Sequence, residues 1–258
     1  MVHDTPHPAA PPAALKGKTA LVTGASRRVG AAIVRALHGA GASVLLHYRS
    51  SADDAAALER ELNAARAGSA RTVEGDLLEV AQLPELVRAA SAAFGGLDIL
   101  VNNASTFYPT PLGDITAIDW DDLIGTNLRA PLFLAQAAAP LLHEARGLIV
   151  NLADIHGVMP LRRYPVYSVA KAGLIMLTKS LARELGPHVR VNAVAPGPVM
   201  WAEDGPDAAL RERIVQRTAL KRAGSPEDVA RACLFFATEA PYVTGQILAV
   251  DGGRSIGW

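Results

Sequence analysis

Short apolar segments rich in β-branched residues alternate with longer amphipathic segments along most of the chain. Strands that alternate with helices in this way form parallel sheets with helices packed on both faces. The short segments are apolar on both sides, as strands buried between two layers of helices must be. The sequence therefore predicts an α/β fold with a doubly wound, seven-stranded parallel sheet. The predicted strands are residues 19–24, 43–48, 71–75, 99–102, 148–152, 190–195 and 247–250, and the predicted helices include 53–66, 83–94, 120–142 and 164–185.

The chain has 258 residues and shows neither an internal repeat nor a linker between patterned regions. This length suits one large α/β domain, which we expect to span residues 15–258. Residues 1–14 hold four prolines and show little periodicity, so they are predicted to be a disordered tail. His3 and His7 in this tail are interpreted as stray side chains, and no metal site is predicted.

Composition restricts the partners and the location of the protein. Lys plus Arg and Asp plus Glu both total 25, so no net charge favours nucleic acid or an anionic membrane. The single cysteine, Cys233, lies in an apolar helical pattern and is predicted to be an unreactive core residue. A lone thiol forms no internal disulfide, and the sequence shows neither a signal peptide nor an apolar run of about 20 residues. We therefore expect a cytoplasmic protein without a membrane segment.

A glycine-containing turn with the sequence TGASRRVG, residues 23–30, joins the first predicted strand to the helical segment that follows. In doubly wound folds this junction binds the pyrophosphate of a dinucleotide, because the helix N-terminus offers N–H groups and a favourable dipole. Gly24 lets the backbone turn tightly, and Gly30 lets the helix pack closely on the strand. The sequence thus predicts a Rossmann-type dinucleotide site that includes Gly24, Arg27, Arg28, Val29 and Gly30.

The end of the second predicted strand favours NADPH over NADH. An NAD-binding fold usually presents a carboxylate there, but this chain has His47, Tyr48, Arg49 and Ser50. Arginine and serine would hold a 2′-phosphate, which a carboxylate would repel. The alternative is that the arginines of this segment and of the glycine turn merely face solvent. Further cofactor contacts are predicted where the next two strands end, from Asp76, Leu77, Asn103, Ala104 and Ser105.

Tyr167 and Lys171 lie four residues apart in a helical pattern, so their side chains share one face of the helix. An unperturbed tyrosine has a pKa near 10, which is too high for easy proton transfer at neutral pH. The nearby ammonium group is expected to stabilise the phenolate and to lower the pKa of Tyr167. The pair therefore predicts a general acid beside the cofactor.

Several short motifs accompany this pair in a fixed order along the chain. They are Thr23-Gly24 with Gly30, Asn102-Asn103-Ala104, Asn127, Tyr167 with Lys171, Pro196-Gly197 and Asp251-Gly252-Gly253. Over nearly all of residues 18–253 the chain thereby resembles the short-chain dehydrogenase/reductase family. The resemblance implies an oxidoreductase, usually tetrameric, in which Lys171 also binds the nicotinamide ribose and Asn127 holds a water of the proton relay. It also implies cofactor contacts from Tyr167, Lys171, Pro196 and Gly197.

One position departs from that family. A serine normally stands 13 residues before the catalytic tyrosine, and this chain has Asp154 there. An ionised aspartate cannot donate a hydrogen bond, and its charge opposes a developing oxyanion. Asp154 suits a substrate whose ring nitrogens take up a proton. The alternative is a chance acid in a loop.

This substitution and three further features resemble the pteridine reductase subgroup. The features are Arg28 in the glycine turn, residues 47–50 (HYRS) and residues 103–109 (NASTFYP). The resemblance implies that a pterin lies between the nicotinamide and the ring of Phe107, where stacking on an aromatic face is favourable. It also implies that Arg28 reaches both the cofactor phosphate and the pterin. The implied substrate contacts are Arg28, Ser105, Phe107, Asp154 and Tyr167.

The implied reaction transfers the pro-S hydride of NADPH to a carbon of a C=N bond in a dihydropterin or dihydrofolate. Asp154 and Tyr167, assisted by Lys171, would deliver the proton to nitrogen. One alternative is a reductase of another carbonyl or imine, such as a 3-oxoacyl substrate, and Asp154 weighs against it. The other is a non-catalytic NADPH-binding subunit, against which the intact set of Asn127, Tyr167 and Lys171 argues.

Residues 197–206 follow a predicted strand and are too rich in Pro and Gly for a helix. A long loop at such a place predicts a substrate lid, with an ordinary surface loop as the alternative. His156, Arg162 and Arg163 lie near the predicted site in sequence. They are interpreted as surface residues rather than as substrate contacts.

Overall fold

The computed structural model describes residues 13–200 and 207–256. Seven strands form one parallel sheet, as predicted, in the order β3-β2-β1-β4-β5-β6-β7. The predicted strand positions are right to within two residues at each end. The strands are β1 (Thr19–Val22), β2 (Ser43–Tyr48), β3 (Ala70–Glu74), β4 (Ile99–Asn102), β5 (Leu148–Leu152), β6 (Arg190–Pro196) and β7 (Ile247–Val250).

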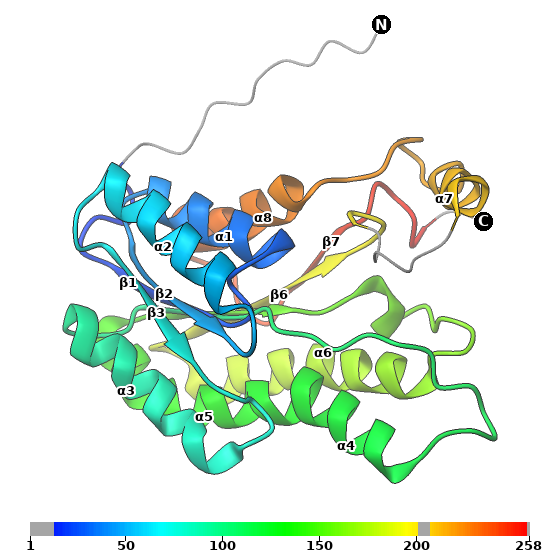
Figure 1. Cartoon of the computed structure of the whole chain (residues 1–258), viewed down its shortest axis with the longest axis horizontal. Helices are drawn as coiled ribbons and strands as arrows, with labels where there is room; N and C mark the ends of the chain where they lie inside the picture. Colours follow the sequence, from blue (N-terminus) through cyan, green and yellow to red (C-terminus); the bar gives the residue numbers. More distant parts are fainter. Residues whose placement is uncertain (1–12, 201–206, 257–258) are drawn as a thin grey trace, which may run out of the picture.

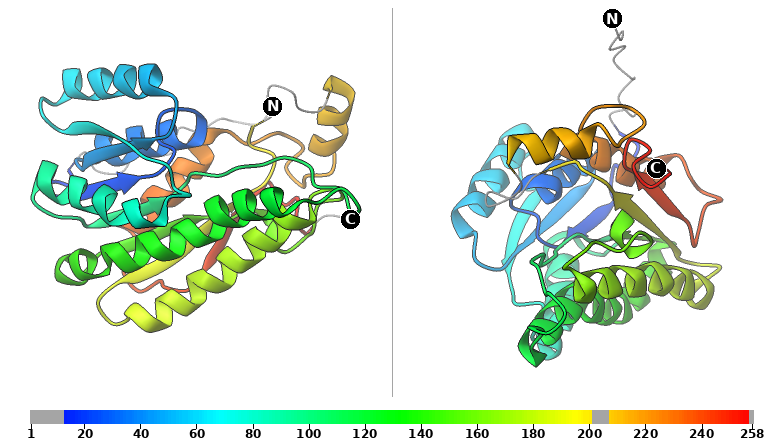
Figure 2. Two further views of the ribbon diagram at one scale, coloured as in Figure 1. Left: turned by 60° about the horizontal axis from the view of Figure 1, so that its bottom comes forward. Right: turned by 90° about the vertical axis from the view of Figure 1, so that its right-hand side faces the viewer.

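Helices cover both faces of this sheet (Figure 1). One face carries α1 (Arg28–Gly39), α2 (Ala52–Ala65) and α8 (Pro226–Thr238). The other carries α3 (Leu83–Phe94), α4 (Ala117–Ile124), η2 (Gly125–Arg129), α5 (Ala130–Ala145) and α6 (Pro165–Leu185), and the views in Figure 2 show the same two layers. The short helix α7 (Ala208–Val215) lies at one end of the molecule, and η1 (Val80–Gln82) and η3 (Ile155–Gly157) are single turns.

The apolar core lies on both sides of the sheet, and the side chains of β2 contribute to both halves of it. Val44 and Leu46 belong to the apolar cluster on the α1 and α8 side. Leu45, which points the other way, belongs to the cluster on the α3 and α5 side. Successive side chains of a strand point to opposite faces, so a strand covered twice must be apolar at every position. This requirement explains the continuous apolar runs of the sequence.

The helix predicted over residues 120–142 is longer than expected and is interrupted. It begins three residues earlier, after Thr116, whose hydroxyl accepts from the N–H of Asp119 while the Asp119 carboxylate accepts from the N–H of Thr116. This capping box fixes the helix start. A π-helical turn, η2, then separates α4 from α5. Such turns occur often at functional sites, and η2 holds Asn127.

The order of the strands determines where the candidate site lies. The chain runs outward from β1 in one direction through β2 and β3, and in the other through β4 to β7. The loops that leave β1 and β4 therefore diverge, and a crevice opens at the carboxyl ends of these strands. The glycine turn follows β1, and residues 103–111 follow β4, so both segments predicted to bind ligands border this crevice.

Some predictions fall partly outside the described residues. Of the predicted tail only residues 13 and 14 are described, and of the predicted lid only residues 197–200. Within the described residues, no helix is long and apolar enough to cross a membrane. Cys233 is buried in the core, as predicted, and burial raises the pKa of its thiol to about 12. It is therefore unreactive at neutral pH.

Candidate active site

A cleft of about 440 Å³ opens at the carboxyl ends of the central strands. It brings together residues that are far apart in the sequence, and it contains every predicted cofactor contact except Gly197. Sequence reasoning missed seven of the lining residues. The predicted residues in the lining are Gly24, Arg27, Arg28, Val29, Gly30, His47, Tyr48, Arg49, Ser50, Asp76, Leu77, Asn103, Ala104, Ser105, Tyr167, Lys171 and Pro196. The missed ones are Ser26, Ser51, Thr106, Thr126, Leu152, Ala153 and Met200.

The glycine turn after β1 is held tightly against the loop after β4. Gly24 has a φ of +60°, and a Cβ atom there would lie 2.9 Å from the Cα of Ala104. The hydroxyl of Thr23 accepts from the N–H groups of Asn103 and Ala104, each at 3.0 Å. Only glycine fits both the left-handed backbone and the close approach at residue 24. The turn therefore has one shape, as a preformed phosphate site requires.

Arg28 stands where the backbone favours glycine. Its φ is +54°, a left-handed conformation that strains any residue with a side chain. The side chain is exposed and lines the cleft at the start of α1. Strained backbone of this kind is often found at functional sites. Arg28 thus presents a permanent positive charge at a helix N-terminus that already attracts anions.

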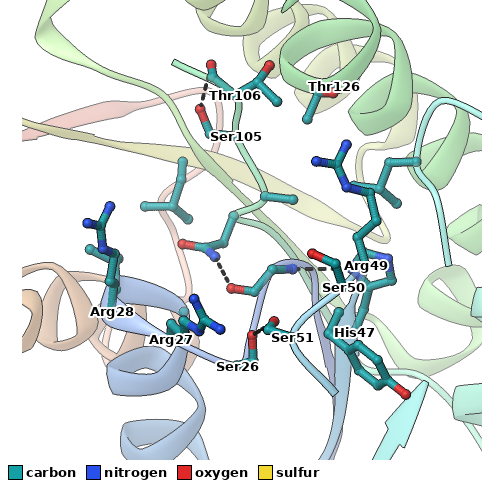
Figure 3. Close-up of a pocket in the computed structure, with 18 of the residues that line it drawn as sticks. Ser26, Arg27, Arg28, His47, Arg49, Ser50, Ser51, Ser105, Thr106 and Thr126 are labelled. Carbon is teal, nitrogen blue, oxygen red and sulfur yellow. Dashed lines mark hydrogen bonds between the residues drawn. The ribbon is translucent and has the colours of Figure 1, made fainter. Parts of the chain in front are cut away.

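Two further arginines and several hydroxyls lie at the same end of the cleft. Figure 3 shows Arg27 and Arg28 on one side and Arg49 on the other, with Ser26 and Ser51 nearby. The Ser26 and Ser51 hydroxyl oxygens are 2.5 Å apart, and a 2.5 Å ion pair joins Arg27 to Asp54 of α2. These contacts tie the glycine turn to the start of α2. Guanidinium and hydroxyl groups in this arrangement fit a phosphate monoester.

His47 lines the cleft at the end of β2 but is almost fully buried. Its Nδ1 accepts from the N–H of Gly24 at 3.2 Å, and its Nε2 is 3.1 Å from the carbonyl oxygen of Gly75. Burial lowers the pKa of the ring to about 4, so His47 is uncharged at neutral pH. Its two ring nitrogens are both bonded to the protein backbone.

Tyr167, which lines the cleft, forms a direct pair with Asp154, which lies outside the lining. The Tyr167 hydroxyl donates to Oδ2 of Asp154 at 2.8 Å, and Oδ1 of Asp154 accepts from the N–H of His156 at 2.8 Å. Asp154 thereby caps η3, which fixes its carboxylate. Lys171 is buried, with its Nζ 5.6 Å from the centre of the Tyr167 ring, and donates to the carbonyl oxygen of Leu152 at 2.8 Å.

The expected lowering of the Tyr167 pKa is wrong for this arrangement. Burial and the Asp154 carboxylate raise the pKa of Tyr167 well above 10. The carboxylate accepts the phenolic hydrogen and so favours the neutral phenol. The Lys171 ammonium lies under the ring and donates to a carbonyl oxygen rather than to the Tyr167 hydroxyl. Burial lowers the pKa of Lys171 to about 8.

Asn127 holds the loop that follows β4. Its amide group donates to the carbonyl oxygens of Leu123 and Thr106, at 2.9 and 3.0 Å. Its Oδ1 accepts from the Ser105 hydroxyl at 2.6 Å. The hydroxyl of Ser105 also lies close enough to Tyr167 to lower the pKa of the tyrosine in part. The side chain of Asn127 is thus fully engaged in holding Ser105 and Thr106 beside Tyr167.

Phe107 lies beside Tyr167 and outside the lining of the main cleft. Its ring stands edge-on to Tyr167, with ring centres 4.8 Å apart, and 48% of the residue is exposed. Tyr164, which sequence reasoning missed, stacks on Phe107 with ring centres 4.6 Å apart and planes 12° from parallel. One face of Phe107 is therefore covered. Tyr164 directly precedes the first residue of α6, and no sequence pattern marked it as a partner of Phe107.

Other predicted residues lie apart from the cleft. Gly197 packs against Asp251, where a Cβ atom would lie 2.6 Å from the Asp251 Cβ, and its N–H donates to the carbonyl oxygen of Val250. Asn102 points into the protein and donates to Asn151. Arg162 and Arg163 are exposed, and the ring of His156 bonds to the carbonyl oxygen of Met159. None of these residues lines the cleft. Of them only Gly197 was predicted to contact the cofactor, whereas His156, Arg162 and Arg163 were predicted to be surface residues.

Comparison with known proteins agrees with this geometry. The family profile described as "Enoyl-(Acyl carrier protein) reductase" matches residues 24–255. The chain is 38% identical to pteridine reductase 1 of Leishmania tarentolae, over 92% of this chain and 96% of that protein. It is also 38% identical to a 3-oxoacyl-[acyl-carrier-protein] reductase of Synechocystis, over 93% of this chain and 98% of that protein.

The chain is also similar to solved structures along nearly its whole length. A blue fluorescent protein from a metagenomic library, solved in complex with NADPH, superimposes with a TM-score of 0.87 at 36% identity, covering 93% of this chain and 98% of its own. A variant of a Serratia marcescens short-chain dehydrogenase/reductase superimposes with a TM-score of 0.87 at 37% identity, covering 93% and 99%. The chain belongs to the short-chain dehydrogenase/reductase family of oxidoreductases.

Proposed function

We propose that this protein is a pteridine reductase, which uses NADPH to reduce a C=N bond of a dihydropterin. The oxidoreductase class follows from the family, whereas the substrate does not. A pteridine reductase and a 3-oxoacyl reductase are equally similar to the chain, at 38% identity each. The choice between them therefore rests on the side chains beside Tyr167.

NADPH is the cofactor. The cleft presents Arg27, Arg28 and Arg49 near the end of β2, and no carboxylate occupies the position that binds ribose hydroxyls in NAD-dependent folds. The left-handed turn at Gly24 and the start of α1 fit the pyrophosphate. Bound there, the cofactor would supply a hydride, and Lys171 would hold its nicotinamide ribose.

The observation that carries the pterin proposal is the hydrogen bond from Tyr167 to Asp154. It puts a carboxylate, rather than a serine hydroxyl, 2.8 Å from the acid that protonates the substrate. A carboxylate accepts hydrogen bonds from N–H groups, and it repels the oxyanion that forms when a ketone is reduced. Asp154 therefore favours a nitrogen heterocycle as substrate.

The neighbouring side chains suit a flat, polar ring. Phe107 is 48% exposed and can stack on a pterin, which would then lie between this ring and the nicotinamide. Arg28 at one side and Ser105 at another can reach polar atoms of the heterocycle. The substrate set is thus Arg28, Ser105, Phe107, Asp154 and Tyr167.

Protons reach the substrate through Tyr167 and Asp154. Tyr167 stays protonated at neutral pH, because its pKa is raised, and its hydroxyl is already aimed at Asp154. A substrate nitrogen beside this pair can take the shared proton. Lys171, with a pKa of about 8, is mostly charged at neutral pH, and its ammonium group, 5.6 Å from the centre of the Tyr167 ring, would assist this transfer by its charge. Asn127 holds Ser105 in place beside Tyr167.

Asp154→Asn tests this proposal. The amide keeps an oxygen that can accept from the N–H of His156, so η3 stays capped, but it removes the charge that takes part in proton transfer. We expect turnover of dihydrobiopterin to fall by about a hundredfold or more, while the Kd for NADPH, measured by fluorescence, changes by less than about twofold. Turnover at the wild-type rate would overturn the assignment of Asp154.

The oligomeric state is proposed to be a homotetramer, in the cytoplasm. Two separate faces expose large apolar side chains. Val169 and Met176, seven residues apart on α6, are 51% and 63% exposed. Phe235 of α8 and Leu248 of the edge strand β7 are 40% and 39% exposed. Two distinct apolar faces on one chain suit an assembly with two kinds of two-fold contact.

A further inference from the structure

The imidazole of His47 joins three segments of the cofactor site. The residue is 2% exposed, at the end of β2. The N–H of Gly24 donates to Nδ1 at 3.2 Å, and Nε2 faces the carbonyl oxygen of Gly75 at 3.1 Å. A carbonyl oxygen only accepts, so Nε2 carries the ring hydrogen and Nδ1 is the acceptor. The ring is therefore the uncharged Nε2–H tautomer.

The main chain of His47 adds to the same contact. Its carbonyl oxygen accepts from the N–H of Ala25 at 2.8 Å. Side chain and main chain of this one residue thus receive two successive N–H groups of the glycine turn. On the other side of the turn, the Asn103 amide donates to the carbonyl oxygens of Thr23 and Gly24, at 2.8 and 2.9 Å. The glycine turn is clamped between the ends of β2 and β4.

We propose that His47 is a positioning residue of the cofactor site, and that its uncharged ring fixes the glycine turn and the end of β3 in the relative arrangement that the dinucleotide requires. Gly24 leads into the start of α1, where the pyrophosphate binds. Gly75 precedes Asp76, which lines the cleft where adenine is expected. His47 acts through these neighbours, whereas the sequence predicted a direct contact with the cofactor. The inference rests on NADPH as cofactor and is independent of the pterin.

The charges around the ring are consistent with this role. Burial lowers the pKa of His47 to about 4, and the bond to the Gly75 carbonyl oxygen and the Asp76 carboxylate oppose this shift only in part. The two groups bonded to the ring, at Gly24 and Gly75, carry no charge. A proton on Nδ1 would face the N–H of Gly24, donor against donor, and the bond would be lost. The clamp therefore depends on a neutral ring.

Substitutions that keep or remove the Gly24 contact test the proposal. His47→Asn keeps an acceptor near the position of Nδ1, whereas His47→Leu removes both ring contacts. The matched control is His38→Leu. His38 is also buried, at 5% exposure, and bonds through Nε2 to the Ser69 hydroxyl at 2.7 Å, but it does not line the cleft. The probe is NADP⁺, titrated by isothermal calorimetry against each full-length variant.

We expect His47→Leu to raise the Kd for NADP⁺ by about tenfold, because the Gly24 N–H loses the acceptor that fixes the glycine turn. His47→Asn should recover most of this loss, and His38→Leu should lower stability without changing the Kd. If His47→Leu does not fold, His47→Gln takes its place, because glutamine keeps only the Gly75 contact. A wild-type Kd in His47→Leu, or in His47→Gln if that variant replaces it, would overturn the proposal. So would a His47→Asn variant whose Kd rises as much as that of the variant lacking the Gly24 contact.

A spectroscopic readout distinguishes this role from simple packing. The ¹⁵N chemical shifts of the His47 ring should report a single Nε2–H tautomer at neutral pH, before and after NADP⁺ is added. A ring that is cationic, or protonated at Nδ1, would contradict the proposed clamp. Failure of the wild-type protein to bind NADP⁺ at all would instead contradict the cofactor, so the two failures are distinguishable.

Discussion

At the scale of single residues, the pKa of the proposed acid, Tyr167, is shifted in the direction opposite to the one expected. Tyr167 was expected to have a lowered pKa, but Asp154 and burial raise it. The group that titrates near neutrality is Lys171, whose pKa falls to about 8 because its ammonium group is buried. In the proposed mechanism Tyr167 therefore holds the proton, and Lys171 is the group that responds to pH.

This tuning predicts the alkaline limb of the pH profile. As pH rises through about 8, Lys171 loses the positive charge that would assist proton delivery by Tyr167, so kcat/KM should fall about tenfold per pH unit above that value. The profile is measured from pH 6 to 10 with the dihydropterin. Lys179→Gln, on the exposed surface of the same helix, serves as the control and should leave the profile unchanged. A rate that stays flat up to an ordinary lysine pKa near 10.4 would refute this role of Lys171.

Arg28 is expected to lower the stability of the fold and to strengthen NADPH binding. Arg28→Gly removes a left-handed strain and should stabilise the fold by about 0.5–1 kcal/mol in urea unfolding. It should also weaken NADPH binding by about tenfold or more, because a charge at the phosphate site is lost. Arg146, at the end of α5 with a φ of +49°, is a matched control. Arg146→Gly should give a similar gain in stability and leave NADPH binding as it is. Unchanged NADPH binding in Arg28→Gly would show that the strained arginine does not meet the cofactor.

Some residue roles could be predicted from the sequence and others could not. The pairing of Asp154 with Tyr167 was anticipated, because the 13-residue spacing is a family property. The actual bonds of His47 were not, since a strand pattern gives the face of a side chain but not its partner. Ser26 and Ser51 were missed for the same reason: their contact joins segments 25 residues apart, through a fold that no local pattern contains.

At the scale of elements, the junction of β1 and α1 depends on the absence of a side chain. A Cβ atom at Gly30 would lie 2.1 Å from the carbonyl oxygen of Gly24 and 2.7 Å from the Asn103 amide. The first turn of α1 therefore packs directly on the glycine turn, as the sequence predicted. Gly39, at the other end of the same helix, has no atom within 4 Å of the corresponding position.

The two glycines of α1 should respond in opposite ways to alanine. Gly30→Ala has to push the glycine turn aside, so we expect a loss of about 3 kcal/mol in the free energy of unfolding, together with weaker NADPH binding. Gly39→Ala should raise stability by about 0.5–1 kcal/mol, because alanine favours the helix and meets no neighbour. Both are measured by urea unfolding. Equal effects of the two substitutions would show that α1 does not pack on the turn as described.

The π-helical turn is the element that the sequence did not reveal. Periodicity predicted one helix across residues 120–142, and the apolar pattern does continue across η2. A π turn changes a few backbone hydrogen bonds and leaves the composition ordinary, so no residue type marks it. Its effect is visible only in three dimensions, where Asn127 reaches the carbonyl oxygens of Leu123 and Thr106.

At the scale of the whole molecule, the sequence predicted the fold and the position of the cleft, because both follow from rules about parallel sheets. Seven apolar segments predicted the strands, and the carboxyl ends of such strands must share one edge. The substrate region did not follow in the same way. It is formed by Phe107 and Tyr164 from two loops, and their stacking depends on how those loops meet.

The most direct test of the proposed function compares substrates on the unmodified enzyme. NADPH oxidation is followed with dihydrobiopterin, dihydromonapterin and dihydrofolate, in parallel with a 3-oxoacyl thioester. Because Asp154 repels an oxyanion and accepts from N–H groups, we expect kcat/KM for the best of the three to exceed that for the thioester by about a hundredfold or more. A preference for the thioester, or no turnover of any pterin, would contradict the proposal.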